Sequence, residues 1–336
     1  MQTSKHKIII LLGPTACGKT SFAVQIANRI HAAILSADSR QIYQGLDIGT
    51  GKDLADYTLS DGTKIPYYLI DIVQPNEEYS LAHYIKDASN ALMEVEKTGY
   101  IPLFVGGTAL YLHAIVSNYH LKHGAPCNKL REKLRVMSSG ELCAELLRLE
   151  PGSVIPLREP DNRTRLIRAI ELAMSAQEPP SAQDVDTCNE LEIPFPESDF
   201  LILGLYRTRQ ENRGRILERL NDRLNHGMLE EIKQLHQNGM SWERMDFLGL
   251  EYRYLSRYLR NEITFDEMKE QLYAKICQFS KRQDSWFRHF EKDGFPIHWL
   301  KPDEIDKAVS LCDAFLADKE IPVPTFKLSE CKYPIH

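Results

Sequence analysis

KIIILLGPTACGKT, residues 7–20, is the stretch of sequence that decides the fold. Its apolar run, residues 8–12, is typical of a strand buried on both faces. The next eight residues match the pattern G-x-x-x-x-G-K-[ST] at every fixed position. Residues 21–30, SFAVQIANRI, then carry apolar side chains at helical spacing. Strand, glycine-rich loop and helix therefore follow one another in the order that a phosphate-binding loop requires.

The loop of residues 13–20 combines the groups that hold a diphosphate. Gly13 and Gly18 permit backbone bends, the loop amides turn toward an anion, and the helix N-terminus adds its positive end. Lys19 supplies a full charge, and the Thr20 hydroxyl can ligate Mg²⁺ held by the same phosphates. We therefore predict diphosphate binding by Gly13, Pro14, Thr15, Ala16, Cys17, Gly18, Lys19 and Thr20. The alternative that these residues leave open is an ordinary strand–turn–helix.

The chain beyond this loop alternates strands with helices. Apolar runs predict three further strands, at 32–35, 67–72 and 102–105. Ser80 can cap a helix whose apolar stripe runs from Leu81 to Val95, while residues 43–65 predict loops. Repeated strand-then-helix order predicts a parallel sheet with right-handed crossovers, the architecture of an α/β protein.

The sequence changes character between residues 116 and 199. Strand-like runs give way there to polar helical segments, and residues 178–199 read as a proline-broken linker. Beyond it we predict a strand at 200–205, one long helix striped from Ile216 to Leu235, and another striped from Met268 to Phe279. The predicted domains are a core of 1–115 with 200–300, a helical insertion at 116–199, and a C-terminal tail at 301–336 of unassigned role.

Composition limits the classes of protein to which the chain can belong. Its 336 residues are 43% hydrophobic, enough for a substantial core and for about two domains. A net charge of −6 excludes a nucleic-acid-binding protein that is basic over its whole surface. Contact with nucleic acid would therefore need local clusters of positive charge. Seven scattered cysteines argue against a disulfide framework or a zinc finger. Without a signal-peptide pattern or a long apolar stretch, the sequence predicts a soluble cytoplasmic protein that does not contact membranes.

Three polar residues fall at the sheet edge where open parallel sheets bind ligands: Asp38 and Thr108 follow predicted strands, and Asp71 lies within the predicted strand at 67–72. Asp38, our first choice, could take a proton from a nucleophile beside the phosphate loop, or could cap a helix. Asp71 ends an apolar run and could hold Mg²⁺ through water as a Walker B aspartate, or could be a structural carboxylate. Thr108 follows two glycines, which let the backbone approach a ligand closely or form a tight turn.

Basic residues cluster in three parts of this acidic chain. The clusters are Arg163, Arg165 and Arg168; Arg209, Arg213, Arg215, Arg219 and Arg223; and Lys281, Arg282 and Arg288 around Trp286 and Phe287. Cations near aromatic rings suit an RNA backbone with unstacked bases. The alternative is a set of solvated helix faces paired with glutamates, but three clusters together favour RNA. No histidine lies at metal-binding spacing, so we predict no zinc site.

Taken in order, the motifs resemble a known family. They are GPTACGKT at 13–20, SADSRQIY at 36–43, GLDIGTGK at 45–52, YYLIDI at 67–72, PLFVGGTALY at 102–111, DNRTRLIRAIE at 161–171 and SKRQDSWFR at 280–288. Together they are similar to the tRNA dimethylallyltransferases, also called tRNA isopentenyltransferases. The resemblance implies a P-loop kinase-like core, with a parallel sheet flanked by helices, and an inserted helical domain. It implies transfer of the dimethylallyl group of dimethylallyl diphosphate to N6 of the adenine just 3′ of the anticodon.

The resemblance also implies roles for individual residues. Asp38 would be the general base at the adenine amine, with Thr108 and Arg219 as further catalytic residues. Arg215 would join the loop in binding the diphosphate, with Mg²⁺ on Thr20. Contacts with the tRNA anticodon stem-loop would come from Asp38, Ser39, Arg40, Gln41, Thr164, Arg165, Arg168, Lys281, Arg282 and Gln283. We expect the protein to act as a monomer.

The sequence departs from the family pattern at three places. Cys17 replaces the more usual Ser or Gly of the loop, Cys277 stands where an arginine is common, and residues 248–253 replace a shorter G-Y-[RK] motif. The main rival function is that of a P-loop nucleotide or small-molecule kinase, which shares the core but has no need of the arginine clusters. A nucleotide-dependent switch would need a base-specificity motif such as N-K-x-D, which the sequence does not contain.

Overall fold

The computed structural model describes residues 6–117, 128–177, 195 and 198–331. The chain divides into two compact units, of which unit 1 consists of Met1–Tyr119 with Ile193–His336 and unit 2 of His120–Glu192. Unit 2 thus interrupts unit 1 in the sequence. Every helix in the described ranges is too short or too polar to cross a membrane.

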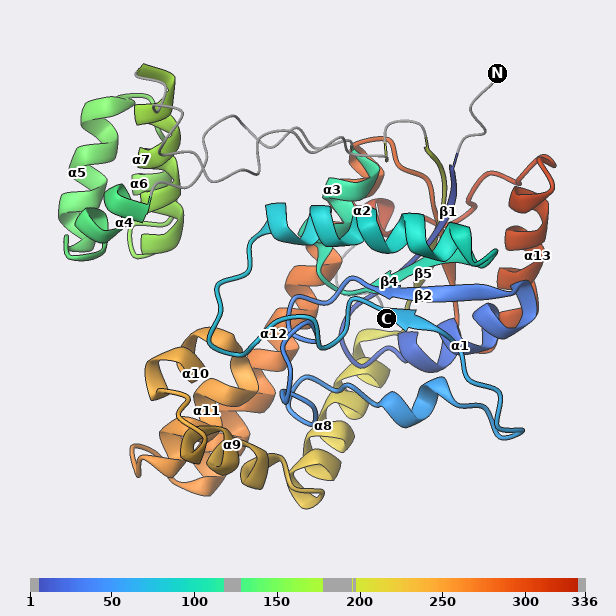
Figure 1. The fold of residues 1–336 in the computed structure, drawn as a ribbon, viewed down its shortest axis with the longest axis horizontal. Helices are drawn as coiled ribbons and strands as arrows, with labels where there is room; N and C mark the ends of the chain where they lie inside the picture. The colour runs from blue at the N-terminus through green and yellow to red at the C-terminus, as the bar shows by residue number, and fades with distance from the viewer. Residues whose placement is uncertain (1–5, 118–127, 178–194, 196–197, 332–336) are drawn as a thin grey trace. The chain divides into compact units, whose positions relative to one another are not determined.

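A six-stranded parallel sheet forms the centre of unit 1 (Figure 1). From edge to edge the strands are β3 (Tyr67–Tyr68), β2 (Ala32–Ser36), β4 (Ile101–Gly106), β1 (His6–Leu12), β5 (Ser198–Leu205) and β6 (Ile297–Leu300). Strand β1 pairs with β4 on one side and with β5 on the other, and its residues 8–12 have no exposed surface. The predicted parallel sheet, with its first strand buried on both faces, is confirmed.

Helices cover both faces of this sheet. On one face, Ile9 and Leu11 of β1 share a hydrophobic cluster with α1 (Lys19–Ile30) and α13 (Ile305–Leu316). On the other, Ile8, Ile10 and Leu12 share a cluster with α2 (Leu81–Lys97), α3 (Ala109–Val116) and α12 (Phe265–Lys292). The segment after residue 300, which the sequence left without assigned structure, therefore contributes α13 to the core and ends in a short 3₁₀ helix, Leu328–Glu330.

Two predicted elements are shorter in the structure. Strand β3 ends at Tyr68 rather than at residue 72, because Leu69 and Asp71 have φ angles of 64° and 56°, which no strand accommodates. The single long helix predicted from the stripe at 216–235 is wrong. The stripe is divided between α8 (Arg209–Asn225) and α9 (Met228–Gln237), because Gly227, at φ 96°, takes the left-handed conformation between them.

A third hydrophobic cluster lies beside the sheet and supports the loop after β2. It joins α8, α9 and α12 to α10 (Trp242–Leu248) and α11 (Leu250–Leu259). Ile42, Tyr43 and Leu46 insert into the same cluster. The predicted loop region 43–65 is thus folded against helices, and it contains a 3₁₀ helix at Leu54–Tyr57.

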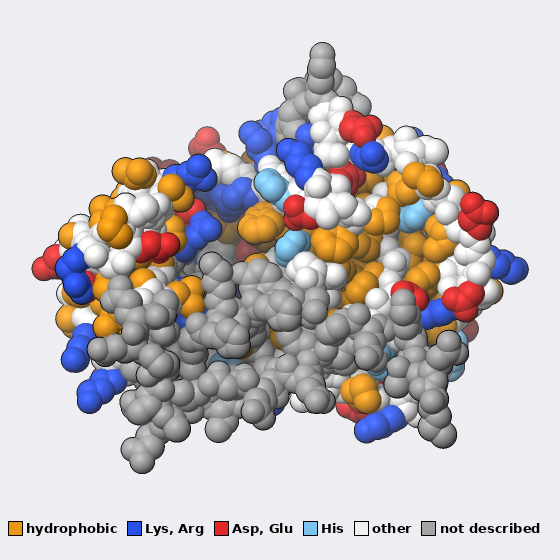
Figure 2. Space-filling model, turned by 90° about the horizontal axis from the view of Figure 1, so that it is seen from above, with side chains coloured by type: hydrophobic (Ala, Val, Ile, Leu, Met, Phe, Trp, Pro, Cys, Tyr) orange, Lys and Arg blue, Asp and Glu red, His pale blue; other side chains and the backbone are white. Residues whose placement is uncertain are grey.

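Unit 2 is helical in its described part. It contains α4 (Asn128–Arg135), α5 (Ser139–Leu149), α6 (Ile155–Arg158) and α7 (Arg163–Gln177), which pack around Leu134, Leu142, Leu146, Leu166 and Ile170. Almost all of the predicted linker at 178–199 lies outside the described residues. On the face shown in Figure 2, described Lys and Arg side chains are interspersed with Asp and Glu.

Candidate active site

The carboxyl ends of four parallel strands meet at one edge of the sheet. The phosphate loop follows β1, Asp38 follows β2, Thr108 follows β4 and Arg207 follows β5. Because β2, β4, β1 and β5 are neighbours in that order, their loops stand side by side. This edge is where an open parallel sheet binds its ligands.

The phosphate loop, residues 13–20, needs both of its glycines. A Cβ atom on Gly13 would lie 2.6 Å from the carbonyl oxygen of Leu205. Gly18 has φ 100° and stands immediately before the first turn of α1, so the helix N-terminus opens onto the loop. The Lys19 ammonium donates to the Pro14 carbonyl at 2.8 Å, which keeps its charge against the loop.

Three arginines also donate to the phosphate loop. Arg215 Nε reaches the Ala16 carbonyl at 3.0 Å, and Arg219 Nη2 reaches Thr15 Oγ1 at 2.5 Å, so both predicted arginines lie at the loop. Arg207 Nε reaches the Cys17 carbonyl at 3.0 Å. Within the described ranges, these arginines and Lys19 donate to loop atoms and form no ion pair with a carboxylate. Four positive charges therefore converge on one loop.

The pKa values of two arginines record the burial of positive charge here. Desolvation, and secondly repulsion by Arg223, lower the pKa of Arg219 to about 10. Desolvation also lowers the pKa of Arg40, against the attraction of Asp38. Both guanidinium groups stay charged at neutral pH. For each of them, desolvation outweighs the attraction of the Glu251 carboxylate.

Thr15, in the middle of the loop, is held by three side chains. Its N–H donates to Gln283 Oε1 at 2.8 Å, its carbonyl accepts from Asn212 Nδ2 at 3.2 Å, and its hydroxyl accepts from Arg219. Gln283 Nε2 in turn donates to the Gly107 carbonyl at 2.8 Å. Helices α8 and α12 thus fix the loop and tie it to the turn after β4.

Gln283 is not placed as the sequence suggested. We expected it to contact RNA, but its side chain is 5% exposed and both ends of its amide bind the backbone of the core. The reason is its spacing on α12, where Ser280, Gln283 and Phe287 face inward together. Lys281 and Arg282 face outward on the same helix, with Arg282 5.9 Å from the ring centroid of Phe279.

Asp38 begins a tight turn beside the turn after β4. Its Oδ1 accepts the N–H of Arg40 at 2.9 Å, and turns rather than a helix follow it, so the helix-cap alternative is wrong. Thr108 Oγ1 accepts the N–H of Ser39 at 3.0 Å and lies 3.3 Å from the Ser39 hydroxyl. A chain of hydrogen bonds thus connects Thr15, through Gln283 and the turn at Gly107, to the Asp38 turn.

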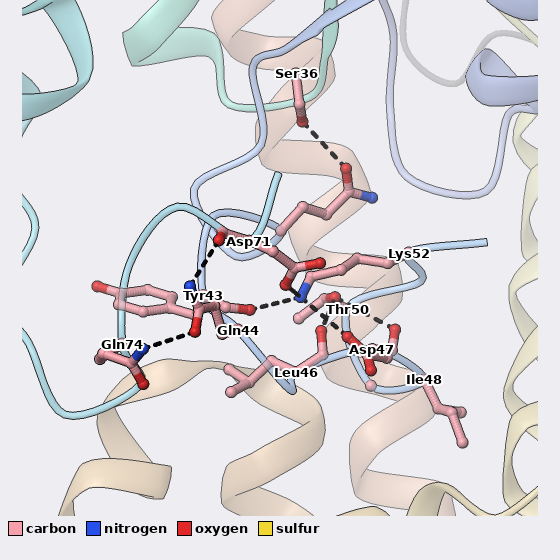
Figure 3. Close-up of polar contacts among 12 residues, drawn as sticks. Ser36, Tyr43, Gln44, Leu46, Asp47, Ile48, Thr50, Lys52, Asp71 and Gln74 are labelled. Atoms are coloured by element: carbon pink, nitrogen blue, oxygen red, sulfur yellow. Dashed lines mark hydrogen bonds and ion pairs between the residues drawn. The ribbon is translucent and has the colours of Figure 1, made fainter. Parts of the chain in front are cut away.

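The loop at 41–52 is held by a buried lysine (Figure 3). Lys52 has a fully buried side chain that donates to the Tyr43 carbonyl at 2.5 Å, to Asp47 Oδ1 at 3.0 Å and to the Asp71 carboxylate. The carboxylate of Asp71 is therefore the partner of Lys52. Of the two readings of Asp71, the structure supports the structural carboxylate rather than the Walker B aspartate.

Glu231 of α9 anchors the same loop from the opposite side. Its carboxylate accepts the N–H groups of Asp47, Ile48 and Gly49 at 2.6–3.1 Å and the hydroxyl of Tyr252 at 2.8 Å. Gln41 connects the C-terminal end of this loop to the end of β2. Its Nε2 donates to the Gly51 carbonyl at 3.1 Å, and its Oε1 accepts from the Ser36 hydroxyl at 3.1 Å. Sequence reasoning missed Lys52 and Glu231 as anchors.

The predicted RNA-contacting residues of unit 2 lie in the first turns of α7. Thr164 and Arg165 are exposed, and Arg165 pairs with Glu159. Arg168 pairs at 3.1 Å with Glu171, a carboxylate that is 2% exposed and also binds Arg131 at 2.7 Å. The clustered arginines of α7 are therefore partly neutralised by glutamates. This agrees with the alternative interpretation of the clusters as solvated helix faces whose charges pair with glutamates.

The donors available at the loop suit a magnesium ion better than a softer metal. Within the described ranges, no three His, Cys, Asp or Glu side chains group to hold a metal. Thr20, in the first turn of α1, is partly exposed and offers a hydroxyl oxygen. Mg²⁺ characteristically takes one or two protein oxygens together with substrate phosphates and water, so this donor set fits it.

The fold and this edge of the sheet define a P-loop α/β protein whose phosphate loop is contacted by Lys19, Arg207, Arg215 and Arg219. The model of the IPP transferase family matches residues 41–290, and that of the isopentenyl transferases matches residues 6–71. The chain therefore belongs to the IPP transferase family, and the resemblance predicted from the motifs is confirmed.

Individual relatives agree with that assignment. The chain is 39% identical over 299 residues to a tRNA dimethylallyltransferase 1 of Syntrophus aciditrophicus, covering 89% of this chain and 95% of the relative. It is 41% identical over 309 residues to a tRNA dimethylallyltransferase 2 of Porphyromonas gingivalis, covering 92% and 98%. Among solved structures, a full-length tRNA isopentenylpyrophosphate transferase of Bacillus halodurans superposes with a TM-score of 0.65 at 25% identity, covering 94% of this chain and 98% of that one.

Proposed function

We propose that the protein transfers the dimethylallyl group of dimethylallyl diphosphate to N6 of the adenine just 3′ of the anticodon in tRNA, releasing diphosphate. Membership of the IPP transferase family supports this reaction. The observation that carries it is the joining of the phosphate loop to the Asp38 turn through Gln283 and Thr108. One group that holds an anion and one that accepts a proton thus stand at the same edge.

The phosphate loop binds the leaving group in this proposal. The loop amides, Lys19, Arg215 and Arg219 contact the diphosphate, and their fixed positive charges favour the transition state, in which charge develops on the departing oxygen. Mg²⁺, held by Thr20 and the phosphate oxygens, supplies further charge neutralisation when bound. Asn212 and Gln283 keep the loop in shape by holding Thr15.

Asp38 is the general base in this proposal. An adenine amine is a weak nucleophile because its lone pair is delocalised into the ring, so its proton must leave as the C–N bond forms. The carboxylate of Asp38 takes that proton. Thr108 positions the Asp38 turn through Ser39, while Ser39, Arg40 and Gln41 border the base, which must first leave its stack.

The tRNA contacts come from both units. Thr164, Arg165 and Arg168 of unit 2 and Lys281 and Arg282 of α12 bind the anticodon stem-loop, mainly through phosphates. Their exposure supports the proposal for Thr164, Arg165, Lys281 and Arg282. Arg168 must exchange part of its pairing with Glu171 for a phosphate. We further propose that the enzyme is a monomer and works in the cytoplasm, where its tRNA substrate is found.

One incubation distinguishes this function from its rival. The protein is mixed with labelled dimethylallyl diphosphate, ATP and total tRNA. The proposal predicts label in the tRNA, at N6 of the adenine next to the anticodon, and no phosphate release from ATP. A P-loop kinase would release or transfer phosphate from ATP and leave the tRNA unlabelled, which would refute the proposal. Gel filtration of the same sample tests the monomer.

A further inference from the structure

Arg207 lies at the phosphate loop but has no part in the reaction described so far. It follows β5, the strand next to β1, so the strand order delivers it to the loop's edge of the sheet. Its Nε donates to the Cys17 carbonyl at 3.0 Å, and a methyl group built on Gly18 would lie 4.0 Å from its Nη2. The guanidinium therefore stands beside Gly18, immediately before the N-terminus of α1.

Arg207 forms no close ion pair in the described part of the chain, and the carboxylate of Glu211 attracts its charge only from a longer distance. The side chain is half-buried, and its only described hydrogen bond goes to the Cys17 carbonyl, with no carboxylate in an ion pair. A guanidinium has five N–H donors in a fixed plane, and anchoring Nε at Cys17 leaves Nη2 on the side of Gly18. A planar pair of guanidinium donors matches two phosphate oxygens.

We propose that Arg207 is a further diphosphate ligand, in which Nε holds the loop through Cys17 while the terminal nitrogens bind phosphate oxygens. This inference rests on the proposed function, since it assumes that the loop holds the diphosphate. As the C–O bond to the dimethylallyl group breaks, its electron pair passes to the diphosphate oxygen. The C–N bond then joins the same carbon to N6, whose proton goes to Asp38. Arg207 stabilises the charge that accumulates on the diphosphate.

The substitution Arg207→Gln separates this role from a purely structural one. The amide nitrogen of glutamine occupies about the position of arginine Nε, so the bond to the Cys17 carbonyl can persist. The positive charge and the terminal donors are lost. Arg213→Gln is the matched control, because Arg213 is an exposed arginine of α8 that donates to no atom of the phosphate loop.

The test measures the affinity for inorganic diphosphate by calorimetry, with Mg²⁺ present. Because a charge-assisted hydrogen-bond pair is lost, we expect the diphosphate Kd of Arg207→Gln to be about 10- to 100-fold higher than that of wild type. The Kd for tRNA and the Tm of this variant should be unchanged. Arg213→Gln should bind diphosphate like wild type. In steady state, the KM for dimethylallyl diphosphate rises and kcat falls. A diphosphate Kd within twofold of wild type would overturn the inference.

Two further variants distinguish loss of the Arg207 contact from misfolding and from failure of the proposed function. Arg207→Lys keeps the charge but has one nitrogen, which cannot bind Cys17 and the diphosphate in the same geometry. It is expected to weaken diphosphate binding about threefold or more, and wild-type affinity in this variant would also overturn the inference, even if Arg207→Gln failed to fold. Lys19→Ala tests the proposed function separately: unchanged diphosphate affinity there would show that the loop is not the diphosphate site at all.

Discussion

Replacing Asp38 by asparagine removes the proposed general base and little else. Asparagine keeps the Oδ1 atom, so the hydrogen bond from the Arg40 N–H, 2.9 Å long in the structure, can persist and the turn keeps its shape. What is lost is a group able to take the proton of the adenine amine. Loss of a general base slows a reaction about 10²–10⁴-fold, which corresponds to about 2.7–5.4 kcal/mol in the activation barrier.

A single-turnover assay measures that loss without interference from product release. Enzyme in excess over tRNA is mixed with labelled dimethylallyl diphosphate, and label in the tRNA is followed with time, while tRNA affinity is measured by filter binding. Asp61→Asn is the matched control, because Asp61 makes the same kind of turn on the surface, accepting the Thr63 N–H at 2.9 Å. We expect slow transfer, unchanged tRNA affinity and a control like wild type. Transfer by Asp38→Asn at a rate within threefold of wild type would refute the assignment, and Asp38→Ala should likewise bind tRNA with little turnover.

Other predictions follow from the same contacts. Gly13→Ala places a Cβ atom 2.6 Å from the Leu205 carbonyl and should cost about 1–3 kcal/mol in urea unfolding, whereas Gly214→Ala, in open space on α8, should add about 0.5–1 kcal/mol. Lys52→Met leaves Asp71 and the Tyr43 carbonyl without their shared donor and should cost about 1–3 kcal/mol, while exposed Lys64→Met should be neutral; equal effects would contradict the anchoring role. Arg165→Gln should lower the slope of log Kd for tRNA against log salt concentration by up to about 0.7–0.9. The decrease should be smaller to the extent that Glu159 already neutralises Arg165. An unchanged slope would show that Arg165 does not contact the tRNA. Chelation by EDTA should stop transfer and added Mg²⁺ should restore it, with Thr20→Val needing more Mg²⁺; full activity in EDTA would exclude the ion.

Local patterns in the sequence were sufficient for the centre of the fold. The apolar run at 8–12 and the glycine-rich loop identified β1 and the first turn of α1, and Ser80 begins α2 as its capping pattern predicted. Strand β3 was predicted too long because apolar residues at 69–72 give no sign of the left-handed conformations that Leu69 and Asp71 adopt. Tertiary contacts hold Asp71 in its conformation: its N–H donates to the Gln41 carbonyl while its carboxylate binds Lys52.

Residues of the candidate site could be predicted where they lie in a local sequence motif. They could not be predicted where segments distant in the sequence meet. Gly18, Lys19, Arg215 and Arg219 came from local patterns and from the resemblance, and they lie at one loop. Glu231 was missed because its role as the acceptor for three successive backbone amides depends on a loop about 180 residues earlier in the chain. An i, i+4 count of charges could only classify it as part of a solvated helix face.

Arg207 was missed as a residue of the phosphate loop, and Gln283 was wrongly expected to face RNA, because neither position follows from residue type alone. Arg207 lies in no motif, and only the adjacency of β5 and β1 brings it to the phosphate loop. Gln283 lies in a motif whose neighbours face outward, but the helical period turns it toward the core. Strand order and helix phase, rather than residue type, decide both cases.

The most direct test of the account is a crystal structure of the protein with a tRNA anticodon stem-loop and an unreactive thio analogue of dimethylallyl diphosphate. We expect the diphosphate in the loop of residues 13–20 and the adenine N6 within about 2.6–3.2 Å of the Asp38 carboxylate. A diphosphate bound outside that loop, or a prenyl chain directed away from Asp38, would contradict this expectation.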